Sequence, residues 1–205
     1  MAVTSLWHVK GSIKDLIDYI ENPEKTVANE DMQDFFCAFS YEKNPLKTKA
    51  GEYVSAINCL KETALQQMIL AKKQYQKIGG YIAWHGYQSF KPDEVTPEQC
   101  HEIGLKLARE MWGGKYQIIV ATHLDKGHLH NHFCFNSVSF IDGQKYNYSK
   151  SEQKRLREVS DRLCREYGLS VIENPKKAPC GKPTRYNVYR EDLREAINGS
   201  RIYSK

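Results

Sequence analysis

Histidines are concentrated in one short segment of the chain. Residues 123–132 contain four of the seven histidines, His123, His128, His130 and His132. Alternate side chains of a β-strand point to the same face, so the last three would share one face of a strand. Three neutral imidazoles can hold a divalent cation and leave coordination positions open for a substrate oxygen. The segment therefore predicts a catalytic metal site.

Two neighbouring strands would have to bring these imidazoles together. Residues 116–123 and 128–138 predict two strands joined by a four-residue link that suits a hairpin. We expect this hairpin to place His123 roughly opposite His128 and diagonal to His130.

Several polar residues could support such a site. A ligating histidine usually donates its second ring N–H to a carboxylate, amide or carbonyl, so Asp125 and Asn136 are candidate partners. Asp125 could equally serve only to shape the turn. His85 and Glu94 are further candidates for orienting a ligand or a nucleophile, and an ordinary structural role is the alternative for both.

The remaining pattern predicts an α+β fold. Its expected form is a central, mostly antiparallel five-stranded sheet with helices packed on its faces. Pro97 at a first helical position and Gly168 after a helix mark element ends. Besides the hairpin, strands are expected at 6–10, 35–41 and 81–87, and helices at 12–21, within 52–77, and at 97–112, 149–167 and 189–198.

Length and charge describe one domain with a basic end. The 205 residues suit a single unit, with a catalytic core at about 1–170 followed by a basic loop and helix at about 171–205. Residues 145–205 hold 15 basic and 8 acidic side chains, against 15 and 17 in residues 1–144. This excess suits a polyanion such as nucleic acid, although a solvated helix face would also explain it.

The composition argues against membrane-spanning and disulfide-stabilised proteins. No apolar run approaches the roughly 18 to 20 residues that cross a bilayer, and no basic segment followed by an apolar stretch opens the chain. The six cysteines form no Cys-x-x-Cys pair and read as reduced core thiols. We expect a bacterial cytoplasmic location.

At this point the residues resemble a known family. The pattern His-x-Asp-x-x-His-x-His-Asn-His-x-x-x-Asn at 123–136 resembles the third motif of mobilisation relaxases, which are HUH endonucleases. The middle position of the histidine pair is hydrophobic in that name and is Asn131 here. Residues 19–26 resemble the first motif, in which a tyrosine is the nucleophile, and 89–97 resemble the middle segment. The similarity spans about residues 5–140.

The resemblance implies the roles of the site residues. It makes His123, His130 and His132 the metal ligands, with Mg²⁺ or Mn²⁺ as the usual cation and Zn²⁺ as a substitute in vitro. It leaves His128 to bind DNA or to support the site. It makes Tyr19 the nucleophile.

A tyrosine hydroxyl with a pKa near 10 needs a polarising cation or a base close to the target phosphorus. Tyr19 would attack in line, form a 5′-phosphotyrosyl bond and release a 3′-hydroxyl. The alternative for Tyr19 is an aromatic residue at the boundary of the core. Asn22, Lys25 and Thr26 follow it and could contact phosphate or simply form a turn.

The expected partners are single-stranded or hairpin origin DNA, accessory relaxosome proteins and a coupling protein. Single-stranded DNA calls for a basic groove with aromatic stacking surfaces. Candidate contacts, for which simple packing is the alternative, are Trp84, Tyr87, Tyr146, Tyr148, Lys150, Arg155 and Arg185.

Three other functions compete with a relaxase. A rolling-circle replication initiator shares the metal and tyrosine chemistry but usually places its histidine pair before the tyrosine. A three-histidine metal hydrolase would activate water and leave Tyr19 without a role. A DNA-binding regulator would use the metal only structurally. The chain could also be the catalytic part of a longer protein.

Overall fold

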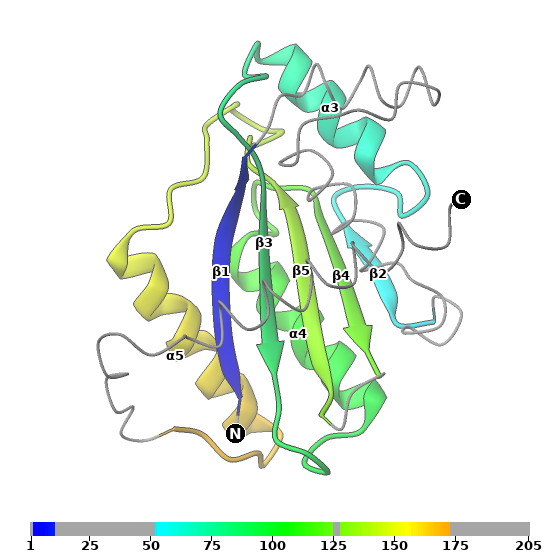
Figure 1. Cartoon of the computed structure of the whole chain (residues 1–205), viewed down its shortest axis with the longest axis vertical. Coiled ribbons are helices and arrows are strands. Elements are labelled where there is room, and N and C mark those ends of the chain that lie inside the picture. The colour runs from blue at the N-terminus through cyan, green and yellow to red at the C-terminus, as the bar shows by residue number, and fades with distance from the viewer. Residues whose placement is uncertain (1, 11–51, 125–127, 173–205) are drawn as a thin grey trace, which may run out of the picture. The chain divides into compact units, whose positions relative to one another are not determined.

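A five-stranded antiparallel sheet is the framework of the described part of the chain (Figure 1). The computed structural model describes residues 2–10, 52–124 and 128–172. Neighbouring strands pair in the order β1 (Val3–Lys10), β3 (Tyr81–Ser89), β5 (His130–Asn136), β4 (Ile118–His123) and β2 (Val54–Ile57). The helices of this part of the chain are α3 (Ala64–Gln74), α4 (Pro97–Met111) and α5 (Lys150–Glu166). This arrangement confirms the expected α+β fold.

Capping residues mark the start of α4 and both ends of α5. The Thr96 side chain accepts from the backbone of Gln99, whose side chain in turn caps Thr96, and Pro97 occupies the first turn. Ser149 caps α5, and Gly168 follows it with a positive φ of 71°. Local sequence therefore determines the start of α4 and both ends of α5.

Helix α4 lies behind the strands in Figure 1, and α5 packs against α4 and β1. Ile103 and Leu107 of α4 and Leu156 of α5 are almost completely buried in one apolar cluster with Phe133 and Phe135 of β5. Burial of such side chains contributes about 1.5–3 kcal/mol each, so this cluster stabilises the packing of both helices on the sheet.

Helix α3 covers the end of the opposite face. Its Leu65, Met68 and Ile69 join a second apolar cluster with Ile119 of β4 and Cys134 of β5. Because Cys134 lies two residues beyond His132 on the same strand, the histidine-bearing face becomes apolar towards α3.

The helix expected within about 52–77 is confirmed as α3, but it is shorter than the range, and a strand precedes it. Residues Val54–Ile57 pair with β4 as the edge strand β2, and α3 begins only at Ala64. Asn58 ends this strand with a φ of 59°, and its amide donates to the carbonyls of Gly113 and Tyr116. Pairing with the open edge of β4 therefore overrides the local pattern.

The structure describes two of the other expected strands, and four expected segments lie outside the described residues. The strands at 6–10 and 81–87 are confirmed and are slightly longer than predicted. The helix at 12–21, the strand at 35–41, the loop at 173–187 and the helix at 189–198 fall outside the described residues. Every named element belongs to the compact unit Met1–Val171. Among the described residues, no helix has the length and apolar character that crossing a membrane requires.

Helix α3 also buries a charged residue. Lys72 is 3% exposed, and its Nζ donates to Ser137 Oγ over 2.6 Å. That hydroxyl donates in turn to the carbonyl of Tyr81. Desolvation lowers the pKa of Lys72 to about 7, and the nearby charge of Lys145 acts in the same direction. The folded protein thus holds Lys72 in surroundings that disfavour its charge.

Replacing Lys72 with methionine should stabilise the fold, by on the order of 2 kcal/mol at pH 6. Between pH 7 and 10.5 the folded wild type binds fewer protons than the unfolded chain, so its stability rises with pH. The advantage of Lys72→Met should therefore shrink as the pH approaches 10. Urea unfolding at pH 6 and 9.5 measures both effects, and an equal gain at the two values would contradict this account.

Candidate metal centre

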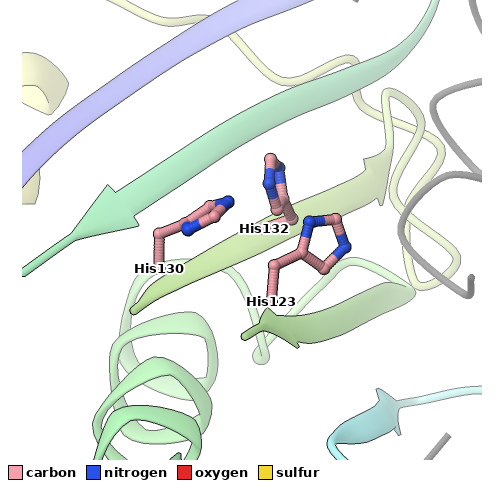
Figure 2. Close-up of side chains that lie close together, drawn as sticks. All are labelled: His123, His130 and His132. Carbon is pink, nitrogen blue, oxygen red and sulfur yellow. The ribbon is translucent and has the colours of Figure 1, made fainter. Parts of the chain in front are cut away.

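Three histidines converge on the sheet where β4 ends and β5 begins. His123 pairs directly with His130, and Ala121 pairs with His132, so the three rings share one face (Figure 2). One ring nitrogen from each lies within 4.8 Å of the others. Ring centroids are 4.3 Å apart for His123 and His132, and 4.9 Å apart for His130 and His132. The side chains are 0–4% exposed.

The register of this strand pair differs from the expected one. His123 lies opposite His130 rather than His128, because β5 begins at His130 and the link between the strands covers residues 124–129. A longer link shifts the register by two residues, which keeps the faces unchanged and moves His128 out of the strand. The structure thus brings together the three histidines that the family resemblance implied.

The donor set fits a divalent cation. Three buried imidazoles with adjacent nitrogens are the ligands of open, catalytic metal sites rather than closed structural ones. Structural sites usually have four protein ligands, often cysteines. Cys134 is a buried thiol on the same face, but it lies at the apolar end of β5 and belongs to the second core cluster. The candidate donors are therefore the three imidazoles.

Hydrogen bonds orient two of the three rings. His130 Nδ1 lies 3.2 Å from the carbonyl oxygen of His128, so an N–H there can donate to it. His132 Nδ1 lies 3.2 Å from Nε2 of His85, a buried residue of β3 whose ring stacks on that of His132. With Nδ1 engaged in these bonds, His130 and His132 would bind a cation through Nε2. His128 and His85 therefore contact ligands.

A buried polar network supports the ligands from the opposite face of the sheet. The Asn131 amide donates to the carbonyl of Cys100 over 2.7 Å and accepts from the Thr122 hydroxyl over 2.6 Å. Thr122 Oγ1 also lies 2.9 Å from Nδ1 of His101 on α4. Burial lowers the pKa of His101, which favours the neutral ring. The residues beside the three ligands are thus tied to α4.

The close approach of α4 explains why Asn131 and Gly104 occur together. A Cβ at Gly104 would lie 2.5 Å from the Asn131 side chain, so only glycine leaves room for the amide. One sign of this role is visible in the sequence. The position between His130 and His132 is hydrophobic in the HUH pattern and is the polar Asn131 in this chain. The alternation of faces places that polar residue in the core and not in the site.

Asn136 and Glu94 both make hydrogen bonds that hold segments of the fold together. The amide nitrogen of Asn136 donates to the carbonyl of Met68 and to Gln117 Oε1, which ties the far end of β5 to α3. Glu94 accepts from the backbone N–H and the hydroxyl of Ser170, which anchors the segment after α5. Among the described residues Asn136 thus bonds to the core rather than to a histidine ligand, whereas a role of Glu94 in orienting a ligand or the nucleophile stays a prediction.

Most of the described candidates for DNA contact belong to the α4/α5 side of the sheet. Trp84 is buried there, with Tyr146 and Tyr148 packed edge-on against it. Arg155 of α5 donates to the carbonyl of Glu110. These residues hold the helices in place and do not face the histidines.

Two further candidates from this set differ in position. Tyr87 pairs with His132 and shares its face, whereas Lys150 is exposed at the start of α5. Several predicted site residues lie outside the described part of the chain, namely Tyr19, Asn22, Lys25, Thr26, Asp125 and Arg185.

Comparison with curated proteins finds relaxases. The chain is 42% identical to a protein rlx of Staphylococcus aureus over 125 residues, which cover 61% of this chain and 39% of that protein. It is 27% identical to the group II intron-interrupted relaxase LtrB of Lactococcus lactis subsp. cremoris over 237 residues, covering 93% and 42%. The chain therefore spans less than half the length of these relatives.

Solved structures share the fold. A Mn-bound MobM relaxase domain in complex with plasmid pMV158 oriT DNA superposes with a TM-score of 0.55 at 14% identity, covering 93% of this chain and 98% of that one. A structure described as the molecular basis of vancomycin resistance transfer in Staphylococcus aureus gives 0.52 at 12% identity, covering 87% and 100%. At these identities the likeness concerns the fold alone.

The family model for the MobA/VirD2-like relaxase nuclease domain matches residues 41–169. That span includes the three converging histidines and the elements α3, β3, α4, β4 and β5 that surround or support them. By sequence, fold and donor set, the chain belongs to the MobA/VirD2-like relaxase nuclease family.

Proposed function

We propose that this chain nicks one strand of DNA at a transfer origin, as the catalytic domain of a relaxase for mobilisation or conjugation. The convergence of His123, His130 and His132 inside the family-matched region carries this proposal. The Mn-bound MobM domain on origin DNA and the relaxase LtrB support it by likeness.

The three histidines would hold Mg²⁺ or Mn²⁺. When bound, the cation would supply Lewis-acid chemistry, polarising a non-bridging oxygen of the scissile phosphate and stabilising charge in the transition state. The protein's own contribution is a fixed donor geometry, set by the β4–β5 register and by the acceptors on His128 and His85. Asp125, two residues after His123, is the proposed carboxylate partner at the same site.

Tyr19 is the proposed nucleophile. Its hydroxyl oxygen would form a bond to phosphorus as the bond from phosphorus to the 3′-oxygen breaks, with the hydroxyl proton lost and a 3′-hydroxyl released. The phosphotyrosyl bond keeps the energy of the phosphodiester, so a 3′-hydroxyl can reverse the step and reseal the strand. Asn22, Lys25, Thr26 and Arg185 are proposed phosphate contacts.

The proposed partners follow from this activity. They are single-stranded or hairpin origin DNA, accessory relaxosome proteins that expose the nick site, and a coupling protein. The relatives come from bacteria, which supports a bacterial cytoplasmic location for the reaction. The C-terminal third carries the excess of basic residues that a DNA partner would neutralise.

A covalent-adduct assay tests the function. Incubation of the protein with end-labelled single-stranded origin DNA and Mn²⁺ should yield a protein–DNA adduct that survives denaturation, together with a fragment ending in a 3′-hydroxyl. Cleavage without any adduct would instead indicate a metal hydrolase that activates water. Binding without cleavage at any metal concentration would favour a DNA-binding regulator.

A further inference from the structure

His85 lies between the candidate metal centre and the edge of the sheet. On β3 its ring is 1% exposed and packs between Trp7 of β1 and His132 of β5. The Trp7 and His85 ring centroids are 4.6 Å apart in an edge-on arrangement at 74°. The His85 and His132 rings are nearly parallel, with centroids 5.4 Å apart. Three adjacent strands thus align Trp7, His85 and His132 on one face.

The hydrogen bond between the two histidines has a defined direction when His132 binds a cation. A neutral imidazole that coordinates through Nε2 carries its proton on Nδ1. His132 Nδ1 lies 3.2 Å from His85 Nε2, so the proton on His132 would point at the lone pair of His85. His85 then accepts this hydrogen bond and carries its own proton on Nδ1.

We propose that His85, held by Trp7, is a positioning residue of the metal centre, which fixes the tautomer and rotation of His132. The inference rests on the proposed metal-dependent function. Trp7 pairs with His85 across the β1–β3 ladder, so the two rings are held by a continuous register of backbone bonds. Trp7 and His132 contact the His85 ring from two sides, which restricts its rotation.

The choice of a histidine as acceptor has an electrostatic consequence. A carboxylate in this place would add negative charge beside the ligand and reduce the net positive charge that the centre presents to a phosphodiester. The acceptor for His132 is an imidazole nitrogen rather than a carboxylate oxygen, and the acceptor for His130 is a backbone carbonyl. At these two ligands the protein fixes geometry without reducing the cation's attraction for a phosphate.

Titration of the metal-free protein with Co²⁺ alone tests this role, because Co²⁺ reports both affinity and coordination through its visible absorption. His85→Leu removes the acceptor and should weaken Co²⁺ binding about 10- to 100-fold. His85→Gln offers a neutral amide oxygen and should recover most of the affinity. His85→Glu should bind Co²⁺ at least as tightly as the wild type. Trp7→Leu should give a smaller loss than His85→Leu.

The matched control is His8→Gln, which changes a histidine one residue from Trp7 whose ring packs on Tyr81 and Trp84 at the other face. It should leave Co²⁺ affinity unchanged. Equal affinity in His85→Leu, His85→Gln and wild type would reduce His85 to a core residue. A loss in His85→Gln as large as in His85→Leu, with an altered absorption spectrum, would make His85 a ligand instead. Tight Co²⁺ binding without any nicking would refute the proposed function and leave this inference intact.

Discussion

Replacing His130 with alanine should abolish tight metal binding and lower the rate of strand nicking about 1,000-fold or more. His130 pairs with His123 and is one of three donors whose nitrogens lie within 4.8 Å of one another. Two remaining imidazoles would bind Mn²⁺ far more weakly than three and would fix its position poorly. Calorimetric titration with Mn²⁺ and single-turnover nicking of labelled origin DNA measure the two losses.

Cys134→Ala is the matched control for this substitution. Cys134 lies on the same strand and the same face as His130 and is completely buried, so its loss should reduce stability but not metal affinity. Treatment of the wild type with EDTA should stop nicking, and added Mn²⁺ should restore it. Nicking by a folded His130→Ala protein at the wild-type rate, with or without EDTA, would contradict a metal role for this triad.

The parts of the fold that local sequence determines were predicted well. Thr96 and Pro97 at the start of α4, and Ser149 and Gly168 at the ends of α5, contain the capping information themselves. The edge strand β2 was missed because its four residues are stabilised by pairing with β4, which lies about sixty residues later. The local sequence of Val54–Ile57 does not predict its pairing with β4.

The site was predicted in composition and only partly in geometry. Alternation along a strand placed His130 and His132 on one face, and the family motif selected His123 as the third donor. The register was wrong by two residues because it depends on the length of the link, which composition does not reveal. Roles such as those of Asn131 and Asn136 depend on helices that pack from distant parts of the sequence.

Tyr19→Phe should eliminate the covalent protein–DNA adduct while leaving Mn²⁺ affinity and DNA binding at the wild-type level. Only the phenolic oxygen is removed, so the donors His123, His130 and His132 are untouched, and the missing oxygen is the atom that would bond to phosphorus. Without it, the turnover of origin DNA should fall to background. Denaturing gel electrophoresis of the labelled strand detects the adduct, and filter binding measures the affinity for DNA.

Two other tyrosines make the Tyr19 experiment decisive. Tyr87 pairs with His132 on the same face, so among the described tyrosines it is the one positioned to compete as nucleophile. Tyr53 donates to Glu98 over 2.6 Å, a bond that raises the pKa of Tyr53 to about 12. Tyr87→Phe and Tyr53→Phe should both still form the adduct. Loss of the adduct in Tyr87→Phe, with its survival in Tyr19→Phe, would transfer the covalent step to β3.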